Sequence, residues 1–232
     1  MIPYADFATR CSEIRERIER ACEAARRRPD EVGILPVTKN HPADAACYAA
    51  QYGFAAVGEN RVQEALDKQP LAPPALRWEL IGHLQSNKAK LAAAHFDRVQ
   101  SVDSDKLLHK LDAAAAEAGK TLAILLQVNA GDDPAKFGAA CAGADALLET
   151  ALNCPHLKVE GLMTIAPLDQ DKSVAAHAFE RLRQTRDRLA ASFATPLPVL
   201  SMGMTDDLEE AVKAGSTLVR IGTALFGTRP GY

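Results

Sequence analysis

The feature that most constrains this chain is a strict alternation of short β-type runs with alanine-rich helical stretches after Gly33. The eight predicted strands are residues 34–38, 54–58, 77–81, 98–102, 122–128, 158–165, 198–202 and 217–221. Strand–helix alternation demands parallel strands joined by right-handed crossovers. Eight such units favour a closed (β/α)8 barrel over an open, doubly wound sheet.

Helical periodicity fills the intervals between these strands, at residues 42–52, 61–68, 86–95, 105–118, 138–152, 173–194 and 206–214. An additional amphipathic helix is predicted at residues 5–28, with Phe7, Cys11 and Ile14 on one face. Its final arginines, residues 26–28, are explained more simply as a cationic last turn than as a polyanion site. We therefore expect an α/β fold: a single (β/α)8 TIM barrel domain over residues 1–232, with an extra N-terminal helix.

The composition matters for the partners that it excludes. A net charge of -3 and a pI of about 6.1 provide no strong field for nucleic acid or acidic lipid. No apolar stretch approaches a membrane span, and the N-terminus lacks the apolar core of a signal peptide. The five scattered cysteines form no CxxC pair, which indicates reduced thiols and no metal site. We expect a cytoplasmic monomer without nucleic-acid or membrane partners.

Polar residues follow the ends of the predicted strands, where a barrel of this kind binds its ligands. They are Lys39, Glu59, Asn60, Gly82, His83, Asn129, Thr164, the segment 201–205, Gly222 and Thr223. Gly222 would let the backbone approach an anion closely, and free N–H groups on the next turn would point at it. Ser201 and Gly203 can add a hydroxyl and another backbone amide. The pattern favours a phosphate site, and a glycine turn that merely connects two elements is the alternative.

Lys39 and Arg220 are the two cations that most need an explanation. Lys39 emerges from the apolar strand predicted at 34–38 into the barrel mouth, where partial desolvation would free its lone pair to attack an aldehyde. The alternative is an exposed lysine that reaches water. Strand parity places Arg220 inside the barrel, where a guanidinium needs an acceptor. Glu59 or Glu79 would make a structural ion pair, and the ring nitrogen of a bound pyridine is the functional alternative.

Six segments of the chain, in this order, resemble the pyridoxal phosphate homeostasis protein family, also called the YggS or proline-synthetase-co-transcribed family. They are VTK at 37–39, GEN at 58–60, IGHLQSNK at 81–88, GLMTI at 161–165, SMGMTDD at 201–207 and VRIGTALFG at 219–227. The likeness runs from about Val32 to Arg229. Thr38 and Asn40 replace the serine and threonine that are commoner beside the lysine, and the loop 129–138 matches only loosely.

The resemblance implies a barrel like the amino-terminal domain of alanine racemase, with pyridoxal 5'-phosphate (PLP) held as a Schiff base. Lys39 matches the Schiff-base lysine, Asn60 the asparagine beside the ring, and Arg220 the arginine near the pyridine nitrogen. The residues that match the phosphate binders are Ser201, Gly222 and Thr223. The resemblance also implies a role in intracellular vitamin B6 homeostasis, with PLP-requiring apoenzymes as candidate recipients.

Three functions are compatible with these residues, and we expect this protein to be a non-catalytic carrier of PLP. A PLP-dependent amino-acid racemase is the first alternative. Alanine racemase takes an opposing catalytic tyrosine from a second domain, whereas this chain ends at Tyr232 directly after the predicted barrel. A Schiff-base aldolase without cofactor is the second alternative; it would use Lys39 but gives Arg220 no task. The sequence therefore predicts cofactor-binding residues and no catalytic ones.

Overall fold

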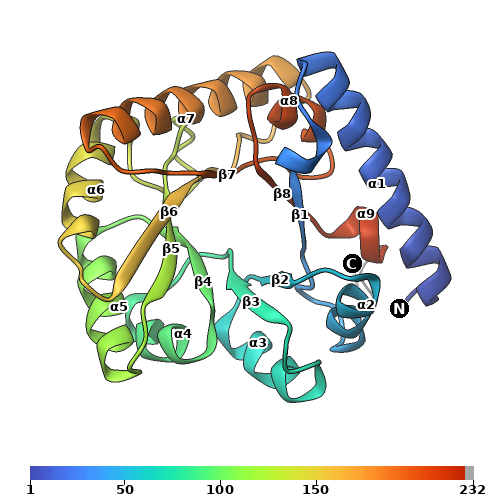
Figure 1. Cartoon of the computed structure of the whole chain (residues 1–232), viewed down its shortest axis with the longest axis horizontal. Coiled ribbons are helices and arrows are strands. Elements are labelled where there is room, and N and C mark those ends of the chain that lie inside the picture. Colours follow the sequence, from blue (N-terminus) through green and yellow to red (C-terminus); the bar gives the residue numbers. More distant parts are fainter. Residues whose placement is uncertain (228–232) are drawn as a thin grey trace.

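A closed ring of parallel strands forms the centre of the computed structural model, which describes residues 1–227 (Figure 1). The strands are β1 (Gly33–Pro36), β2 (Ala56–Glu59), β3 (Arg77–Leu80), β4 (Arg98–Val102), β5 (Leu122–Gln127), β6 (Leu157–Met163), β7 (Val199–Ser201) and β8 (Leu218–Ile221). They pair in the order β1-β8-β7-β6-β5-β4-β3-β2. Between β1 and β2 the ring closes through one bridge, Val37 to Gly58, where the Thr38 N–H donates to the Gly58 carbonyl at 3.0 Å. The predicted barrel is confirmed.

Helices alternate with the strands and surround the barrel (Figure 1). After the N-terminal helix they are α2 (Asp44–Tyr52), α3 (Val62–Lys68), α4 (Ala89–His95), α5 (Asp105–Glu117), α6 (Ala144–Leu152), α7 (Lys172–Ser192), α8 (Leu208–Lys213) and α9 (Thr223–Phe226). The predicted helix at 138–152 begins only at Ala144, because Ala139 instead forms a parallel bridge with Val128. Residues 86–88, predicted as α-helix, form a 3-10 turn.

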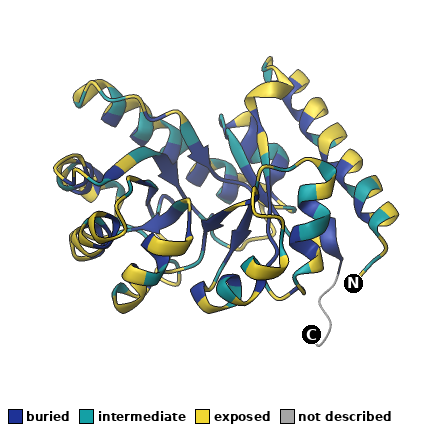
Figure 2. Cartoon of the chain, turned by 60° about the horizontal axis from the view of Figure 1, so that its bottom comes forward, coloured by how far each residue is buried: buried dark blue, intermediate teal, exposed yellow. Residues whose placement is uncertain are grey.

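The apolar core lies between the outer surface of the barrel and the inner faces of the helices. In Figure 2 the strands are mostly buried, whereas the exposed residues lie on the helices and the loops. Val57, Leu80, Val99 and Ile124, one from each of four successive strands, belong to one large cluster with side chains of the surrounding helices. This two-layer core positions the strand ends, and hence the loops that follow them. Within residues 1–227, no helix is long and apolar enough to cross a membrane.

The N-terminal helix α1 (Tyr4–Ala25) lies outside the regular strand–helix alternation and packs on α8 and α9. Phe7, Cys11 and Ile14 are buried, as the helical periodicity predicted. The prediction of a cationic last turn is wrong, because Arg26 adopts a left-handed conformation (φ 55°) and ends the helix. Arg27 instead reaches across to α8, where its guanidinium donates to the Val212 carbonyl at 2.6 Å.

Candidate functional site

A cavity of about 640 Å³ opens at the carboxyl ends of the strands. The structure brings five of the seven predicted binding residues to its wall: Lys39, Asn60, Arg220, Gly222 and Thr223. Other lining residues include Gly82, His83, Gln127, Lys136, Phe137, Thr205, Asp206 and Ala224. Ser201 and Gly203 do not line the cavity. The convergence follows from the barrel, which places the loops after all eight strands around one mouth.

A buried polar cluster holds the end of β1, from which Lys39 projects. The Lys68 ammonium donates to the Thr38 carbonyl at 2.8 Å, and the Thr38 hydroxyl donates to Glu59 at 2.5 Å. Lys68 also pairs with Glu59 and with Glu64, each at 2.7 Å. Burial raises the pKa of the Glu59 carboxyl, and Lys68 opposes that rise. The backbone on the N-terminal side of Lys39 is thus fixed by groups that lie behind the cavity.

Arg220 lines the cavity and is only 4% exposed. Its guanidinium donates to the Ser201 hydroxyl and to the Thr164 carbonyl, both at 2.8 Å. Burial lowers the pKa of Arg220 to about 10, so the group stays protonated near neutral pH. The predicted need for an acceptor partner is confirmed. The structural alternative, an ion pair with Glu59 or Glu79, does not form, because Glu59 pairs with Lys68 and Glu79 with Arg98.

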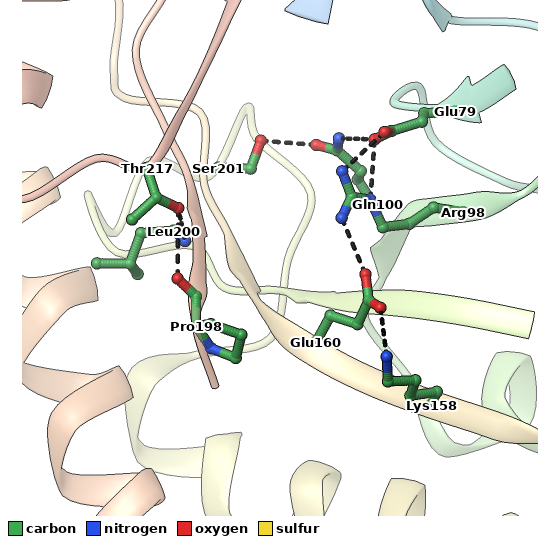
Figure 3. A network of polar contacts seen from close by, with 9 residues as sticks. All are labelled: Glu79, Arg98, Gln100, Lys158, Glu160, Pro198, Leu200, Ser201 and Thr217. Atoms are coloured by element: carbon green, nitrogen blue, oxygen red, sulfur yellow. Dashed lines mark hydrogen bonds and ion pairs between the residues drawn. The ribbon is translucent and has the colours of Figure 1, made fainter. Parts of the chain in front are cut away.

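A chain of hydrogen bonds that begins at Ser201 crosses the interior of the barrel (Figure 3). The Ser201 hydroxyl donates to the Gln100 side-chain carbonyl at 2.6 Å, and the Gln100 amide donates to Glu79 at 2.6 Å. Arg98 holds the Glu79 carboxylate through two bonds of 2.7 and 2.9 Å. Since β4 and β7 are not neighbours in the sheet, the Gln100–Ser201 bond spans the interior. The Ser201 hydroxyl is therefore oriented to accept from Arg220.

Two loops contribute backbone donors to one side of the cavity. The loop after β7 brings Thr205 and Asp206, and the segment after β8 brings Gly222, Thr223 and Ala224. The N–H groups of these five lining residues donate to no acceptor within residues 1–227. Converging, unsatisfied N–H groups are suited to bind an anion. We call this set the amide cradle.

Gly203 shapes the amide cradle without lining the cavity. Its φ of 96° lies in the left-handed region, and a Cβ atom there would come within 2.4 Å of the Ala211 side chain. Glycine is therefore required for the turn that brings Thr205 to the cavity. Thr205 was not among the predicted binding residues. The available signal was its place in the segment 201–205, which follows a predicted strand and therefore belongs to the loops at the barrel mouth.

The loop after β5 covers another side of the mouth. Phe137 stacks on His83 with 3.8 Å between ring centroids and 11° between ring planes. Asn129 does not reach the cavity, because its amide nitrogen donates to the Asp133 carbonyl at 2.8 Å within the same loop. Thr164 is also directed elsewhere, since its hydroxyl donates to the Val128 carbonyl at 2.7 Å. Within residues 1–227, no cluster of side chains is suited to hold a metal ion.

Comparison with protein families and characterised relatives gives a consistent result. A model described as alanine racemase, N-terminal domain, matches residues 10–230. The pyridoxal phosphate homeostasis protein of Pseudomonas aeruginosa is 41% identical over 224 residues, covering 96% of each chain. The protein of the same name from Escherichia coli K12 is 38% identical over 234 residues, covering 97% of each.

Solved structures agree with these matches. PipY of Synechococcus elongatus, in a structure with PLP bound, is 38% identical and superposes with a TM-score of 0.84, covering 95% of this chain and 100% of PipY. A Bifidobacterium adolescentis protein of unknown function gives a TM-score of 0.91 at 32% identity, covering 97% and 98% of the two chains. Alanine racemase of Clostridium difficile, at 13% identity, shares the fold with a TM-score of 0.75, covering 93% of this chain and 56% of the enzyme.

Proposed function

This chain belongs to the family of alanine racemase N-terminal domains and to the pyridoxal phosphate homeostasis proteins, and on that premise we propose that it binds PLP at the barrel mouth. The observation that carries the proposal is the convergence of three groups on one cavity: the Lys39 amine, the buried Arg220 guanidinium and the amide cradle. An aldehyde, a pyridine nitrogen and a phosphate need these three kinds of partner. PipY, a protein 38% identical to this chain, has PLP bound in its structure.

Lys39 and the amide cradle have complementary tasks in this proposal. Lys39 would hold the aldehyde end of PLP through its amine, whose condensation with an aldehyde releases the aldehyde oxygen and the two amine protons as water. The cradle binds the phosphate through the N–H groups of Thr205, Asp206, Gly222 and Thr223, aided by the threonine hydroxyls. Asn60, on the wall of the same cavity, would lie beside the ring. Two attachment points fix both ends of the bound molecule.

Arg220 would set the electronic character of a bound pyridine ring. Its pKa of about 10 keeps the guanidinium protonated, so it would donate to the ring nitrogen and leave that nitrogen without a proton. PLP supplies an electron sink when its ring nitrogen is protonated, and an arginine partner weakens that sink. The site therefore favours holding the cofactor over turning over amino acids. Racemisation of alanine by the loaded protein at about 1 per second or faster would contradict this non-catalytic role.

Borohydride reduction of the PLP-loaded protein tests the binding mode. Reduction converts the C=N bond into a stable secondary amine, which peptide mass mapping locates. We expect the adduct on Lys39. Lys136 is the matched control, because it is a second primary amine in the wall of the same cavity. An adduct on Lys136, or none at saturating PLP, would refute the proposed role of Lys39.

The role of Ser201 is tested by Ser201→Ala. Its hydroxyl is fully buried and already bonded to Arg220 and Gln100, so we propose that it serves the site by orienting Arg220. Loss of that bond should weaken the binding of PLP and of unphosphorylated pyridoxal alike, by about fivefold for a bond of ~1 kcal/mol. Equilibrium dialysis measures both affinities. A loss confined to PLP would instead support the sequence-based prediction that Ser201 binds the phosphate.

The setting of this function is also a proposal. We propose that the chain works as one domain, as a monomer in the cytoplasm, and passes PLP to apoenzymes that require it. The five cysteines, all unpaired, support a reducing compartment. The names of the relatives, which refer to PLP homeostasis, support a role in vitamin B6 balance.

A further inference from the structure

The N-terminal helix contacts the amide cradle from outside the barrel. Arg17 of α1 donates through its terminal nitrogen to the carbonyl of Thr205 at 2.9 Å. The same guanidinium forms a two-point ion pair with Glu209 of α8, with bonds of 2.8 and 2.9 Å. Thr205 is a lining residue of the cavity, so a helix that contributes no lining residue is in direct contact with the cavity wall.

The contact between Arg17 and the Thr205 carbonyl also determines the direction of the next N–H group, that of Asp206. In a planar trans peptide the C=O and the N–H point in opposite directions. Because the Thr205 carbonyl points outward to Arg17, the Asp206 N–H of the same peptide points toward the cavity that Asp206 lines. That N–H has no acceptor within residues 1–227. A second cation, Lys172 of α7, donates to the Asp206 carbonyl from outside in the same way.

The ion pair between Arg17 and Glu209 orients the Arg17 guanidinium more than it stabilises the fold. The two side chains are 27% and 37% exposed, and pairs of this kind contribute about 0–1 kcal/mol to folding. Two parallel bonds nevertheless fix the plane of the guanidinium. The second N–H of Nη2, the terminal nitrogen that also bonds Glu209, is thereby directed at the Thr205 carbonyl.

The same helix also supports the second loop of the cradle. Phe7 of α1 stacks on Phe226 of α9, with 5.0 Å between ring centroids and 18° between ring planes. Phe226 ends the short helix that begins at Thr223, whose N–H belongs to the cradle. Figure 1 shows α1 running alongside both α8 and α9. One helix therefore braces both segments that supply donors.

We propose that Arg17 is a positioning residue, which holds the Thr205–Asp206 peptide so that its N–H faces the phosphate and thereby sets the preference for phosphorylated over unphosphorylated B6 vitamers. The inference rests on the proposed binding of PLP. It assigns to the extra N-terminal helix a task in ligand selection, beyond covering one side of the barrel.

Arg17→Leu tests the inference, with Arg15→Leu as the matched control. Arg15 lies on the same helix, but it is exposed and packs over the Tyr52 ring at 5.2 Å, away from the cradle. Dissociation constants for PLP and pyridoxal are measured by equilibrium dialysis. We expect Arg17→Leu to weaken the binding of PLP by roughly tenfold, which is the effect of losing a charge-assisted bond of ~1.4 kcal/mol. The binding of pyridoxal should weaken by less than about twofold. Arg15→Leu should change neither.

Hydrogen exchange of the ligand-free protein gives an independent readout. In Arg17→Leu, the Met204 amide, which donates to the Asp207 carboxylate at 2.6 Å, should exchange faster than in Arg15→Leu, because the outer anchor of its loop is gone. Arg17→Lys, which keeps a cation able to reach the Thr205 carbonyl, should restore part of the PLP affinity.

Equal losses for PLP and pyridoxal, or no loss in Arg17→Leu, would overturn the inference while leaving PLP binding intact. Absence of saturable PLP binding by the unaltered protein would overturn the proposed function, and the inference with it. The two failures are therefore distinguished by the unaltered protein alone.

Discussion

Replacement of Lys39 by alanine is expected to abolish the visible absorbance band of the PLP-loaded protein and to weaken PLP binding by roughly 100-fold, or about 2.7 kcal/mol. No C=N bond can form without the amine, and the cradle and Arg220 then hold the cofactor without a covalent bond. Absorbance titration and dialysis measure the two effects. The reason for so large an effect is local: Lys39 is the amine that β1 presents at the cavity wall.

Lys136→Ala is the control for this prediction, because it removes an amine from the same cavity while keeping Lys39. We expect the absorbance band to persist in Lys136→Ala. A band that survives in Lys39→Ala and disappears in Lys136→Ala would transfer the covalent role to the other lysine.

The second large effect is expected on stability, from Lys68→Met. Lys68 is the cation that pairs with Glu59, whose side chain is completely buried. Removing one partner of a buried pair leaves an uncompensated charge, and such changes cost about 3–5 kcal/mol of the free energy of unfolding. Denaturant unfolding measures the loss. The bond from Lys68 to the Thr38 carbonyl also disappears, so the end of β1 should loosen beside Lys39.

Two controls separate this mechanism from a general loss of charge. Lys90→Met removes an exposed pair with Glu117 and should cost less than about 1 kcal/mol. The double variant Lys68→Met, Glu59→Gln should recover part of the stability, because no buried carboxylate remains unpaired. Equal losses in Lys68→Met and Lys90→Met would contradict the proposed importance of burial.

The pH dependence of the Lys68→Met variant follows from Glu59. Burial already raises the pKa of Glu59 above its unfolded value, and removing Lys68 removes the effect that opposes the rise. A raised folded pKa means that the folded state binds more protons, so the contribution to stability is present at low pH and is lost as the pH rises through the folded pKa. The deficit of the variant relative to the unaltered protein should therefore shrink as the pH falls through the raised folded pKa of Glu59, and should be smallest below about pH 4, where Glu59 is protonated in the folded and the unfolded state.

Much of the fold could be predicted because the alternation of strands and helices is local information. All eight strands were found, and their ends were in error by up to two residues, as at β1, which ends at Pro36 and was predicted to reach residue 38. The start of α6 could not be predicted, because the bridge between Ala139 and Val128 is a tertiary contact that overrides helical periodicity. The end of α1 was missed because nothing in the sequence identifies Arg26 as left-handed.

The candidate site was predictable to the extent that strand ends meet at one mouth. Lys39, Asn60, Gly222 and Thr223 reached the cavity as expected from their positions after strands. The acceptor that bonds the Arg220 guanidinium could not be predicted, because it depends on distances across the barrel that the spacing of residues in the sequence does not give. Ser201 lies below the cavity and Thr205 on its wall, a distinction set by the turn at Gly203.

The hydrogen-bond chain from Arg98 through Glu79 and Gln100 to Ser201 limits how these four positions can change in evolution. Each member uses its donors and acceptors on its neighbours, so an apolar replacement at one position leaves a desolvated polar atom at the next. Sequences in which only one member of the chain has been replaced are therefore less stable. Among homologous barrels, these positions should vary as a correlated set, with the arginine beneath the ligand constraining residues at the far end of the barrel.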